Sequence, residues 1–182
     1  MRVIGGEFRS RKLQSMPGEE VRPTPDKMRE TLFNILQTQI EGSVFVDAYA
    51  GTGAVGIEAL SRGARYAIFI EKNREAANLI KSNLSSLGIA GRARVIQGAA
   101  AVILAGPELT GMHPDFVFID PPYPKEFEYR AAMEALEDSP PKLAVVQHSA
   151  RFALKEAYGP LHRTRTLKQS ENTLSFFTAL SD

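Results

Sequence analysis

The chain has 182 residues, of which 43% are hydrophobic and 24% are charged, and its net charge is only +1. This composition is typical of a soluble globular protein of one domain, and it excludes a low-complexity chain. The absence of cysteine excludes disulfides and thiolate metal sites. No apolar run approaches the roughly 18 residues of a membrane span, and the N-terminus lacks the apolar stretch of a signal peptide. We therefore expect a cytoplasmic protein.

The first part of the chain predicts a small extension followed by a helix. Residues 1–14 alternate loosely around Gly5-Gly6, which is typical of a short hairpin, and residues 15–23 are rich in Pro, Gly and Glu, which indicates a loop. Thr24 suits an N-cap and Pro25 suits the first helical position. Apolar residues then recur at helical spacing as far as Ile40. We predict a hairpin and loop extension over residues 1–23 and a main domain over residues 24–182.

From residue 44 the sequence alternates short apolar strands with helices. Helices are expected at about 53–62, 74–87 and 127–138. The expected strands are Val44–Asp47, Tyr66–Ile70, Arg94–Gln97, Phe116–Asp120 and Ala144–Gln147, followed by an antiparallel hairpin of Leu161–Lys168 and Thr173–Leu180. The first strands are apolar throughout rather than alternating, which indicates burial on both faces. This order predicts an α/β fold with a mostly parallel sheet and right-handed crossovers.

The basic residues gather near the two ends of the chain. Residues 1–12 contain four basic residues against one acidic residue, and residues 151–168 contain five against one. Such segments on a neutral body are consistent with a local phosphate-binding face. A solvated surface without a partner explains the same pattern, so charge alone leaves both interpretations open.

A glycine-rich loop follows the first strand of the main domain. Gly51, Gly53 and Gly56 match G-x-G-x-x-G between a strand and a helix. Glycine permits a sharp turn and lets a ligand approach the backbone closely. In open α/β sheets, ligands bind at the carboxyl ends of the strands near the switch point. Glu71 ends the next strand, where a carboxylate can accept both hydroxyl hydrogens of a ribose, or can instead cap the helix that follows.

The acid at the end of the first strand, Asp47, bears on the cofactor that this loop binds. A carboxylate beside the pyrophosphate of NAD would be repelled, because like charges at close range are costly. S-adenosylmethionine has a positive sulfonium and a free ammonium, and these charges favour a neighbouring carboxylate. The loop with Asp47 therefore favours S-adenosylmethionine over NAD. Asp47 can also cap the following helix, and the two roles are compatible.

The fourth expected strand ends in Asp120-Pro121-Pro122-Tyr123. Proline stiffens the backbone and removes its N–H donor, so this segment presents carbonyl oxygens. A carboxylate and a carbonyl can accept the two hydrogens of an exocyclic base amine and direct its lone pair toward a methyl group. Tyr123 can stack on the flat base. The segment predicts methylation of a base amine, which requires no metal, and the sequence has no His/Asp/Glu cluster with metal-ligand spacing. The alternative is a simple turn after a strand.

Four other residues remain open between a functional and a structural role. Arg22, Thr24 and Arg29 flank the start of the first helix, where they can reach the cofactor or RNA phosphates, or act only in capping and surface charge. His148 follows the fifth expected strand and can line the pocket, although a lone histidine is more often structural.

Taken together, these residues resemble the RsmD-type bacterial 16S rRNA guanine-N2 methyltransferases. The resemblance runs in order over nearly the whole chain. The segments that carry it are Arg2-Val3-Ile4-Gly5-Gly6 to Leu13, Arg22-Pro23-Thr24, Arg29 to Leu36, Asp47 to Gly53, Gly56 to Ala64, Glu71, and Asp120 to Tyr123. The glycine loop and Asp-Pro-Pro-Tyr are shared with many amino-methyltransferases, so the two N-terminal segments are the more specific ones.

The resemblance implies a Rossmann-like class I methyltransferase fold with a seven-stranded sheet, helices on both faces and a C-terminal hairpin. It implies methyl transfer from S-adenosylmethionine to the N2 amine of one guanine in the 16S rRNA of the small ribosomal subunit. We expect a monomer that requires no metal and contacts no membrane. The expected amine site is Asp120, Pro121, Pro122 and Tyr123. The expected cofactor contacts are Asp47, Tyr49, Ala50, Gly51, Thr52, Gly53, Glu71, Gly98, Ala99 and Asp120, and the expected RNA contacts are Arg2, Arg9, Arg11, Lys12, Arg22 and Arg29.

The sequence departs from the class at two positions. An acid that reads the cofactor's adenine commonly follows the third strand, but this chain has Gln97-Gly98-Ala99-Ala100, so backbone groups near Ala99 or the Gln97 side chain are the candidates. The fifth strand ends in Gln147-His148 where some relatives have an acid, which leaves the role of that edge open. Three other functions stay open: a DNA adenine or cytosine amino-methyltransferase, an NAD-dependent oxidoreductase, and a silent RNA-binding assembly factor.

Overall fold

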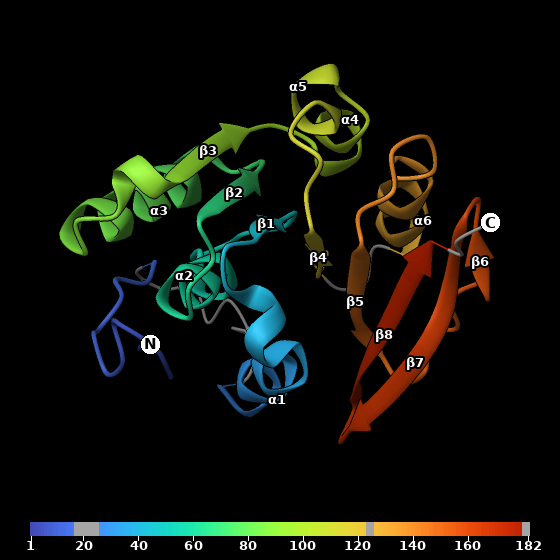
Figure 1. Ribbon diagram of the computed structural model, residues 1–182, viewed down its shortest axis with the longest axis horizontal. Coiled ribbons are helices and arrows are strands. Elements are labelled where there is room, and N and C mark those ends of the chain that lie inside the picture. Colours follow the sequence, from blue (N-terminus) through green and yellow to red (C-terminus); the bar gives the residue numbers. More distant parts are fainter. Residues whose placement is uncertain (17–25, 123–125, 180–182) are drawn as a thin grey trace.

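The computed structural model describes residues 1–16, 26–122 and 126–179, which form one mixed sheet with helices on both faces (Figure 1). The strands are β1 (Val44–Asp47), β2 (Tyr66–Glu71), β3 (Ala93–Gln97), β4 (Phe116–Ile119), β5 (Leu143–Ser149), β6 (Ala157–Tyr158), β7 (Leu161–Gln169) and β8 (Asn172–Ala179). The α-helices are α1 (Asp26–Leu36), α2 (Ala54–Ser61), α3 (Arg74–Ser86), α4 (Ala100–Leu104), α5 (Pro107–Thr110) and α6 (Glu126–Glu134). Two 3-10 turns are η1 (Gln37–Ile40) and η2 (Ala90–Arg92).

The strand order across the sheet is β3-β2-β1-β4-β5-β8-β7-β6. The five strands β1 to β5 pair in parallel, whereas β8 is antiparallel to β5, and β7 is antiparallel to both β8 and β6. This confirms the α/β fold class and the C-terminal hairpin. The sheet has eight strands rather than the seven that the resemblance implies, because the two-residue strand β6 adds to the outer edge of β7.

The order of the strands creates a switch point between β1 and β4. From β1 the chain crosses to β2 and β3 on one side, and it then returns to place β4 and β5 on the other side (Figure 1). Loops that leave neighbouring strands at a switch point diverge, so their carboxyl ends frame a crevice. The glycine loop after β1 and the Asp-Pro-Pro segment after β4 therefore lie on the same edge.

Apolar residues pack on both faces of the parallel strands. In β1, Phe45 belongs to the core under α1, α2 and α3, whereas its neighbour Val46 belongs to the core under α4, α5 and α6. Successive side chains of a strand point to opposite faces, so a strand covered on both sides must be apolar at every position. The structure confirms the inferred burial for β1, β2, β4 and β5, whereas β3 lies at the edge of the sheet and is partly exposed, so the inference is wrong for that strand. Within the described residues, no helix combines the length and apolarity that a membrane span requires.

The N-terminal segment reverses direction as expected, but it does not form a strand pair. Its strand-like pairing is one isolated bridge between Arg2 and Lys12. The amides of Ile4 and Gly5 instead donate to the Glu58 carboxylate of α2, at 2.9 and 2.8 Å. No ladder continues from the bridge, because the Val3 carbonyl accepts from the Ser10 amide, at 2.9 Å, and the Arg11 amide donates to the Phe8 carbonyl instead. The proposed domain boundary at residue 23 lies outside the described residues and stays a prediction.

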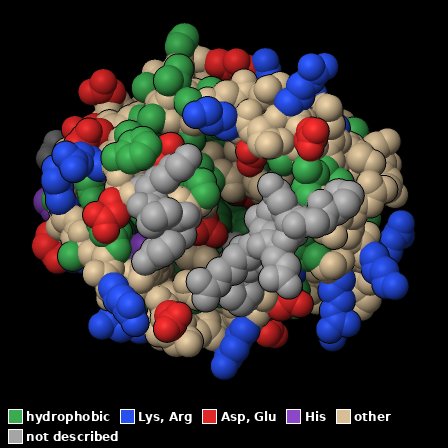
Figure 2. Space-filling view, turned by 180° about the vertical axis from the view of Figure 1, so that it is seen from behind, with side chains coloured by type: hydrophobic (Ala, Val, Ile, Leu, Met, Phe, Trp, Pro, Cys, Tyr) green, Lys and Arg blue, Asp and Glu red, His purple; other side chains and the backbone are tan. Residues whose placement is uncertain are grey.

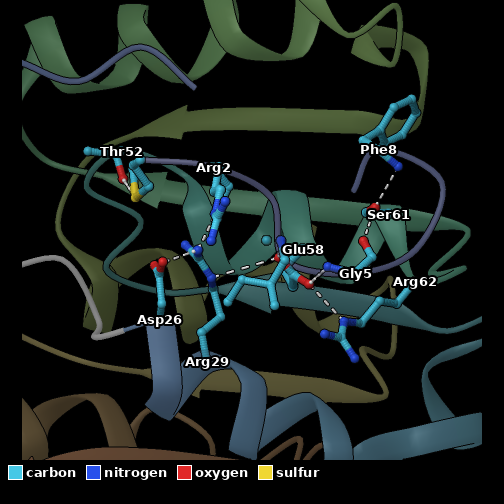
Figure 3. A network of polar contacts seen from close by, with 12 residues as sticks. Arg2, Gly5, Phe8, Asp26, Arg29, Thr52, Glu58, Ser61 and Arg62 are labelled. Carbon is cyan, nitrogen blue, oxygen red and sulfur yellow. Dashed lines mark hydrogen bonds and ion pairs between the residues drawn. The ribbon is translucent and has the colours of Figure 1, made fainter. Parts of the chain in front are cut away.

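A buried charge network attaches this segment to α1 and α2 (Figure 3). Arg29 is fully buried, and its Nη2 donates to the Arg2 carbonyl at 2.7 Å and to Asp26 Oδ1 at 3.0 Å. Arg29 Nε lies 3.8 Å from Glu58 Oε2, and Glu58 Oε1 accepts from Arg62 Nε at 2.8 Å. The expectation that Arg29 contacts RNA is therefore wrong for this structure, because its guanidinium is enclosed between the N-terminal segment and the two helices.

Candidate active site

A cavity of about 910 Å³ opens at the carboxyl ends of the parallel strands. Its walls come from the five segments that follow β1, β2, β3, β4 and β5, together with α6 residues and the turn between β7 and β8. Figure 2 shows a hollow near the centre of one face, with acidic side chains around it. The cavity thus lies at the switch point, where the glycine loop and the Asp-Pro-Pro segment meet.

The glycine loop turns from β1 into α2 by a left-handed backbone. Gly51 has φ +55° and Gly53 has φ +80°, a region that residues with a side chain rarely adopt. A Cβ on Gly56 would lie 2.4 Å from Cε1 of Phe69 in β2, so glycine is needed there for the close packing of α2 on the sheet. Glycine is thus required at the three positions of the motif for different structural reasons. The loop places Ala50, Gly51 and Thr52 on the cavity wall, while Gly53 supports the turn.

Asp47 ends β1 beneath the loop and is only 2% exposed. Its Oδ2 accepts the Gly56 amide at 3.0 Å, so the expected role as a cap for α2 is present. Burial, with smaller contributions from the negative charges of Asp120 and Glu71, raises the pKa of Asp47 to about 7 against the lowering effect of the Gly56 amide. An acid with this pKa is costly to ionise without a cation, and Asp47 lines the cavity.

Glu71 ends β2 and uses both carboxylate oxygens on backbone amides. Oε2 accepts from the Gly51 amide at 2.8 Å, and Oε1 accepts from the Asn73 amide at 2.7 Å. Asn73 itself caps α3 through two amides, so the simple capping interpretation of Glu71 is incomplete. Glu71 connects the glycine loop to the start of α3. Each carboxylate oxygen has a second lone pair, and the predicted contact with a ribose stays a prediction.

The Asp-Pro-Pro segment leaves β4 directly into the cavity, which Asp120, Pro121 and Pro122 all line. The register of β4 on β5 pairs Ile119 with Val146. Asp120 therefore follows at the level of Gln147 on the neighbouring strand. Tyr123, the predicted stacking residue, lies outside the described residues.

Tyr49 lies in the loop, and its position depends on a contact that the sequence did not reveal. Its hydroxyl donates to Glu128 Oε2 of α6 at 3.0 Å. Burial, and then the hydrogen bond and charge of Glu128, raise the pKa of Tyr49. Glu128 and its neighbour Tyr129 also line the cavity. The local pattern of α6 contains no signal for either role, because Tyr49 and Glu128 are distant in sequence.

The end of β3 contributes backbone rather than a side chain. Gly98, Ala99 and Ala100 line the cavity, and the Gly98 amide donates to the Glu71 carbonyl at 3.1 Å. Gln97 is exposed and does not belong to the cavity wall. Of the two candidates for reading the cofactor's adenine, the structure favours the backbone near Ala99.

At the end of β5, the neighbouring polar residues Gln147 and His148 both line the cavity, but their side chains differ in their hydrogen bonds. His148 Nε2 lies 2.8 Å from Ser175 Oγ, and its Nδ1 lies 2.9 Å from the Ser149 carbonyl. Burial lowers the pKa of His148. These contacts support the structural interpretation of His148, although it also lines the cavity. Gln147 is 6% exposed, and its Oε1 has no hydrogen-bond partner among the described residues.

The predicted RNA contacts at the N-terminus are on the surface. The side chains of Arg2, Arg9, Arg11 and Lys12 are exposed. Arg22 lies outside the described residues. The N-terminal segment also approaches the cavity, because Met16 belongs to its wall.

The charge of the cavity wall is predominantly negative. Among the described residues, it has five acidic residues, Asp47, Glu71, Asp120, Glu128 and Glu171, against Lys72 and Arg151. A wall with this balance suits a positively charged ligand and opposes a pyrophosphate. No group of three potential ligands is placed to hold a metal ion within residues 1–16, 26–122 and 126–179.

Comparisons with known proteins agree with this arrangement. A family model described as Conserved hypothetical protein 95 matches residues 1–178. YlbH of Bacillus subtilis is 35% identical over 91% of each chain. The Ribosomal RNA small subunit methyltransferase D of Escherichia coli is 43% identical over 68% of this chain and 60% of its own length. The solved structure of yhhF from Escherichia coli, 30% identical, superimposes with a TM-score of 0.84 over 100% of this chain and 99% of that one.

Proposed function

The chain belongs to the family described as Conserved hypothetical protein 95, and from this premise we propose that it methylates the exocyclic N2 amine of a guanine in 16S rRNA, with S-adenosylmethionine as the methyl donor. This membership agrees with the resemblance to the RsmD-type enzymes. The name of the Escherichia coli relative supports ribosomal RNA of the small subunit as the substrate. We further propose that the protein acts as a monomer in the cytoplasm.

The observation that carries the proposal is the placement of Asp47 and Asp120 on one cavity wall, at the carboxyl ends of adjacent strands. The acid under the glycine loop suits the positive groups of S-adenosylmethionine. The acid after β4 suits an amine that becomes positive as it accepts a methyl group. The two carboxylates would thus lie beside the cofactor and the base amine, which occupy the cavity together.

The mechanism follows from what these residues can hold. When bound, S-adenosylmethionine supplies an electrophilic methyl group on a sulfonium. Asp47 and the loop Gly51 to Gly53 would hold it, with Glu71 on its ribose. The Asp120 carboxylate and the carbonyls of the proline segment would accept the two amine hydrogens, which directs the nitrogen lone pair at the methyl carbon. The same oxygens would stabilise the positive charge that develops on the nitrogen, and the Asp120 carboxylate would accept the proton that the methylated amine must lose.

The structure disfavours one of the three other functions, and experiment separates the remaining two from the proposal. The acidic wall disfavours the NAD-dependent oxidoreductase, because a pyrophosphate there would meet the carboxylates of Asp47 and Glu71. A DNA amino-methyltransferase would use the same chemistry, so only its product separates it from the proposal. An RNA-binding assembly factor would bind cofactor or RNA without transfer.

One experiment separates these functions. Labelled S-adenosylmethionine is incubated with the protein and with small subunits from a strain that lacks the enzyme, and the product is digested and mapped. We expect label in N2-methylguanine at one position of 16S rRNA. Label only in DNA, or intact cofactor binding without transfer, would exclude the proposed reaction.

We propose that the exposed basic residues of the N-terminal segment bind RNA phosphates. Replacing both Arg9 and Arg11 with Ala should raise the KM for RNA about tenfold and reduce its salt dependence, because two phosphate contacts are lost. Steady-state methyl transfer at several salt concentrations measures this. Lys142→Ala is the matched control, since Lys142 precedes β5 at the opposite edge of the sheet. An unchanged KM in the double variant would place the RNA elsewhere.

A further inference from the structure

Gln147 stands beside the predicted amine site. Beyond the last pair of the β4–β5 ladder, Ile119 with Val146, the next positions are Asp120 and Gln147. Neighbouring strands of a sheet are about 4.8 Å apart. Both residues line the cavity, so a base whose amine meets Asp120 presents its adjoining edge to Gln147.

The side chain of Gln147 lacks the partners that its burial calls for. It is 6% exposed, and Oε1 is buried without a hydrogen bond among the described residues. Buried polar atoms are nearly always paired, because an unpaired one costs folding free energy. The other such atoms in the described chain belong to Arg29 and Thr173, and neither residue lines the cavity. Among the described residues of the cavity wall, Gln147 is therefore the one with such an atom, and rotation of its amide would present that oxygen to a ligand.

The chemistry of the bases identifies that ligand. Guanine has a ring N–H, at N1, next to its exocyclic amine, whereas adenine and cytosine have a lone pair at the corresponding ring nitrogen. The next group of guanine is the O6 acceptor. An amide offers an acceptor and a donor side by side, which matches N1–H and O6. A base that presents a lone pair beside its amine cannot satisfy the acceptor.

We propose that Gln147 determines specificity for guanine, by accepting N1–H at Oε1 and donating to O6 from Nε2. This rests on the proposed function, since it assumes that a base amine is held at Asp120. Rotation about the terminal torsion of the side chain exchanges the amide oxygen and nitrogen. A flipped amide can donate one hydrogen bond to a ring lone pair. It forms two hydrogen bonds only when the edge of the base presents a donor and an acceptor side by side, as N1–H and O6 of guanine do.

The test compares guanine with 2-aminopurine, which keeps the 2-amine but has a lone pair at N1 and no O6. Each base is placed at the mapped position of a small-subunit RNA, and kcat/KM is measured for both. We expect the protein to prefer guanine about 100-fold. Gln147→Met keeps the length of the side chain without its hydrogen bonds, and it should reduce the preference to within about threefold. The Kd for S-adenosylhomocysteine should not change.

Two further variants complete the design. Gln147→Glu retains an acceptor for N1–H but replaces the donor to O6 with a second oxygen that O6 repels, so its preference for guanine should also fall below that of the parent. Thr173→Val removes a buried hydroxyl group that also has no partner among the described residues but lies outside the cavity. This variant should leave the preference for guanine unchanged. An unaltered preference for guanine in Gln147→Met, or in Gln147→Glu, would overturn the proposal. If the parent protein transfers no methyl group to guanine, the proposed function itself fails, and this outcome is distinct.

Discussion

Replacing Asp120 with Ala is expected to lower kcat for methyl transfer about 10³-fold. The carboxylate lines the cavity at the end of β4, and it would both orient the amine and stabilise the positive charge that develops there. Removing a preorganised electrostatic group of this kind costs about 10²- to 10³-fold in rate, and loss of orientation adds to this. Single-turnover transfer to small subunits measures the step directly.

The cofactor should remain bound in this variant. The expected Kd for S-adenosylhomocysteine changes by about threefold at most, because Asp47 and the glycine loop supply the cofactor contacts. Asp115→Asn is the matched control: Asp115 lies just before β4, at the opposite end of the strand, where it accepts the Val44 amide at 2.8 Å. An active Asp120→Ala variant would show that the amine site has been placed on the wrong residues.

The parts of the site that sequence analysis predicted are those encoded by contiguous residues. Gly51, Gly53 and Gly56 lie on one turn, and Asp47 precedes them by a few positions, so their spacing alone indicates a ligand loop at the end of a strand. Asp120 with its two prolines is similarly local. The structure places both segments on one cavity because the strand order brings β1 beside β4. The alternation of strands and helices already implied that sheet.

What sequence analysis missed depends on contacts between distant segments. Arg29 has a favourable position for RNA in the sequence, but the N-terminal segment covers it, and Glu58 neutralises it from another helix. The hydrogen bond of Tyr49 with Glu128 joins the glycine loop to α6. Neither residue of such a pair carries a local pattern, so only the packed structure reveals it. The added strand β6 was missed because two residues have no periodicity.

Gln147 is a partial case. The sequence located it at the carboxyl end of a strand and left its role open. Its significance comes from two structural facts, the register beside Asp120 and an amide oxygen without a hydrogen-bond partner in the described part of the chain. Both facts depend on spatial neighbours from distant parts of the chain, which the sequence alone does not identify.

Replacing Asp47 with Asn is expected to stabilise the unliganded protein at pH 8 and to weaken cofactor binding. Burial raises the pKa of Asp47 from 3.8 to about 7 in the folded state. The folded protein thus binds a proton more tightly than the unfolded chain. The stability that Asp47 contributes is full below about pH 4 and is lost as the pH rises to about 7. Asn has no charge to desolvate and can still accept the Gly56 amide, so the variant should be about 4 kcal/mol more stable at pH 8 and similar to the parent at pH 4.

Cofactor affinity should change in the opposite direction. The ammonium group of the cofactor favours ionised Asp47, so binding below pH 7 must displace a proton from the carboxyl group. The Kd of the parent for S-adenosylhomocysteine should therefore fall as the pH rises from 5.5 to 7.5, by up to about tenfold per unit at the acidic end. Asp47→Asn should bind about 10- to 100-fold more weakly at pH 7.5 and should lose this pH dependence. Calorimetry across the range and urea unfolding at pH 4 and pH 8 measure the two effects. A Kd for the parent that does not vary with pH would mean that Asp47 does not pair with the cofactor. Ionised Asp47 lowers the stability of the protein when the site is empty, and a bound cation restores that stability. Such a site suits a methyl donor that is itself a cation.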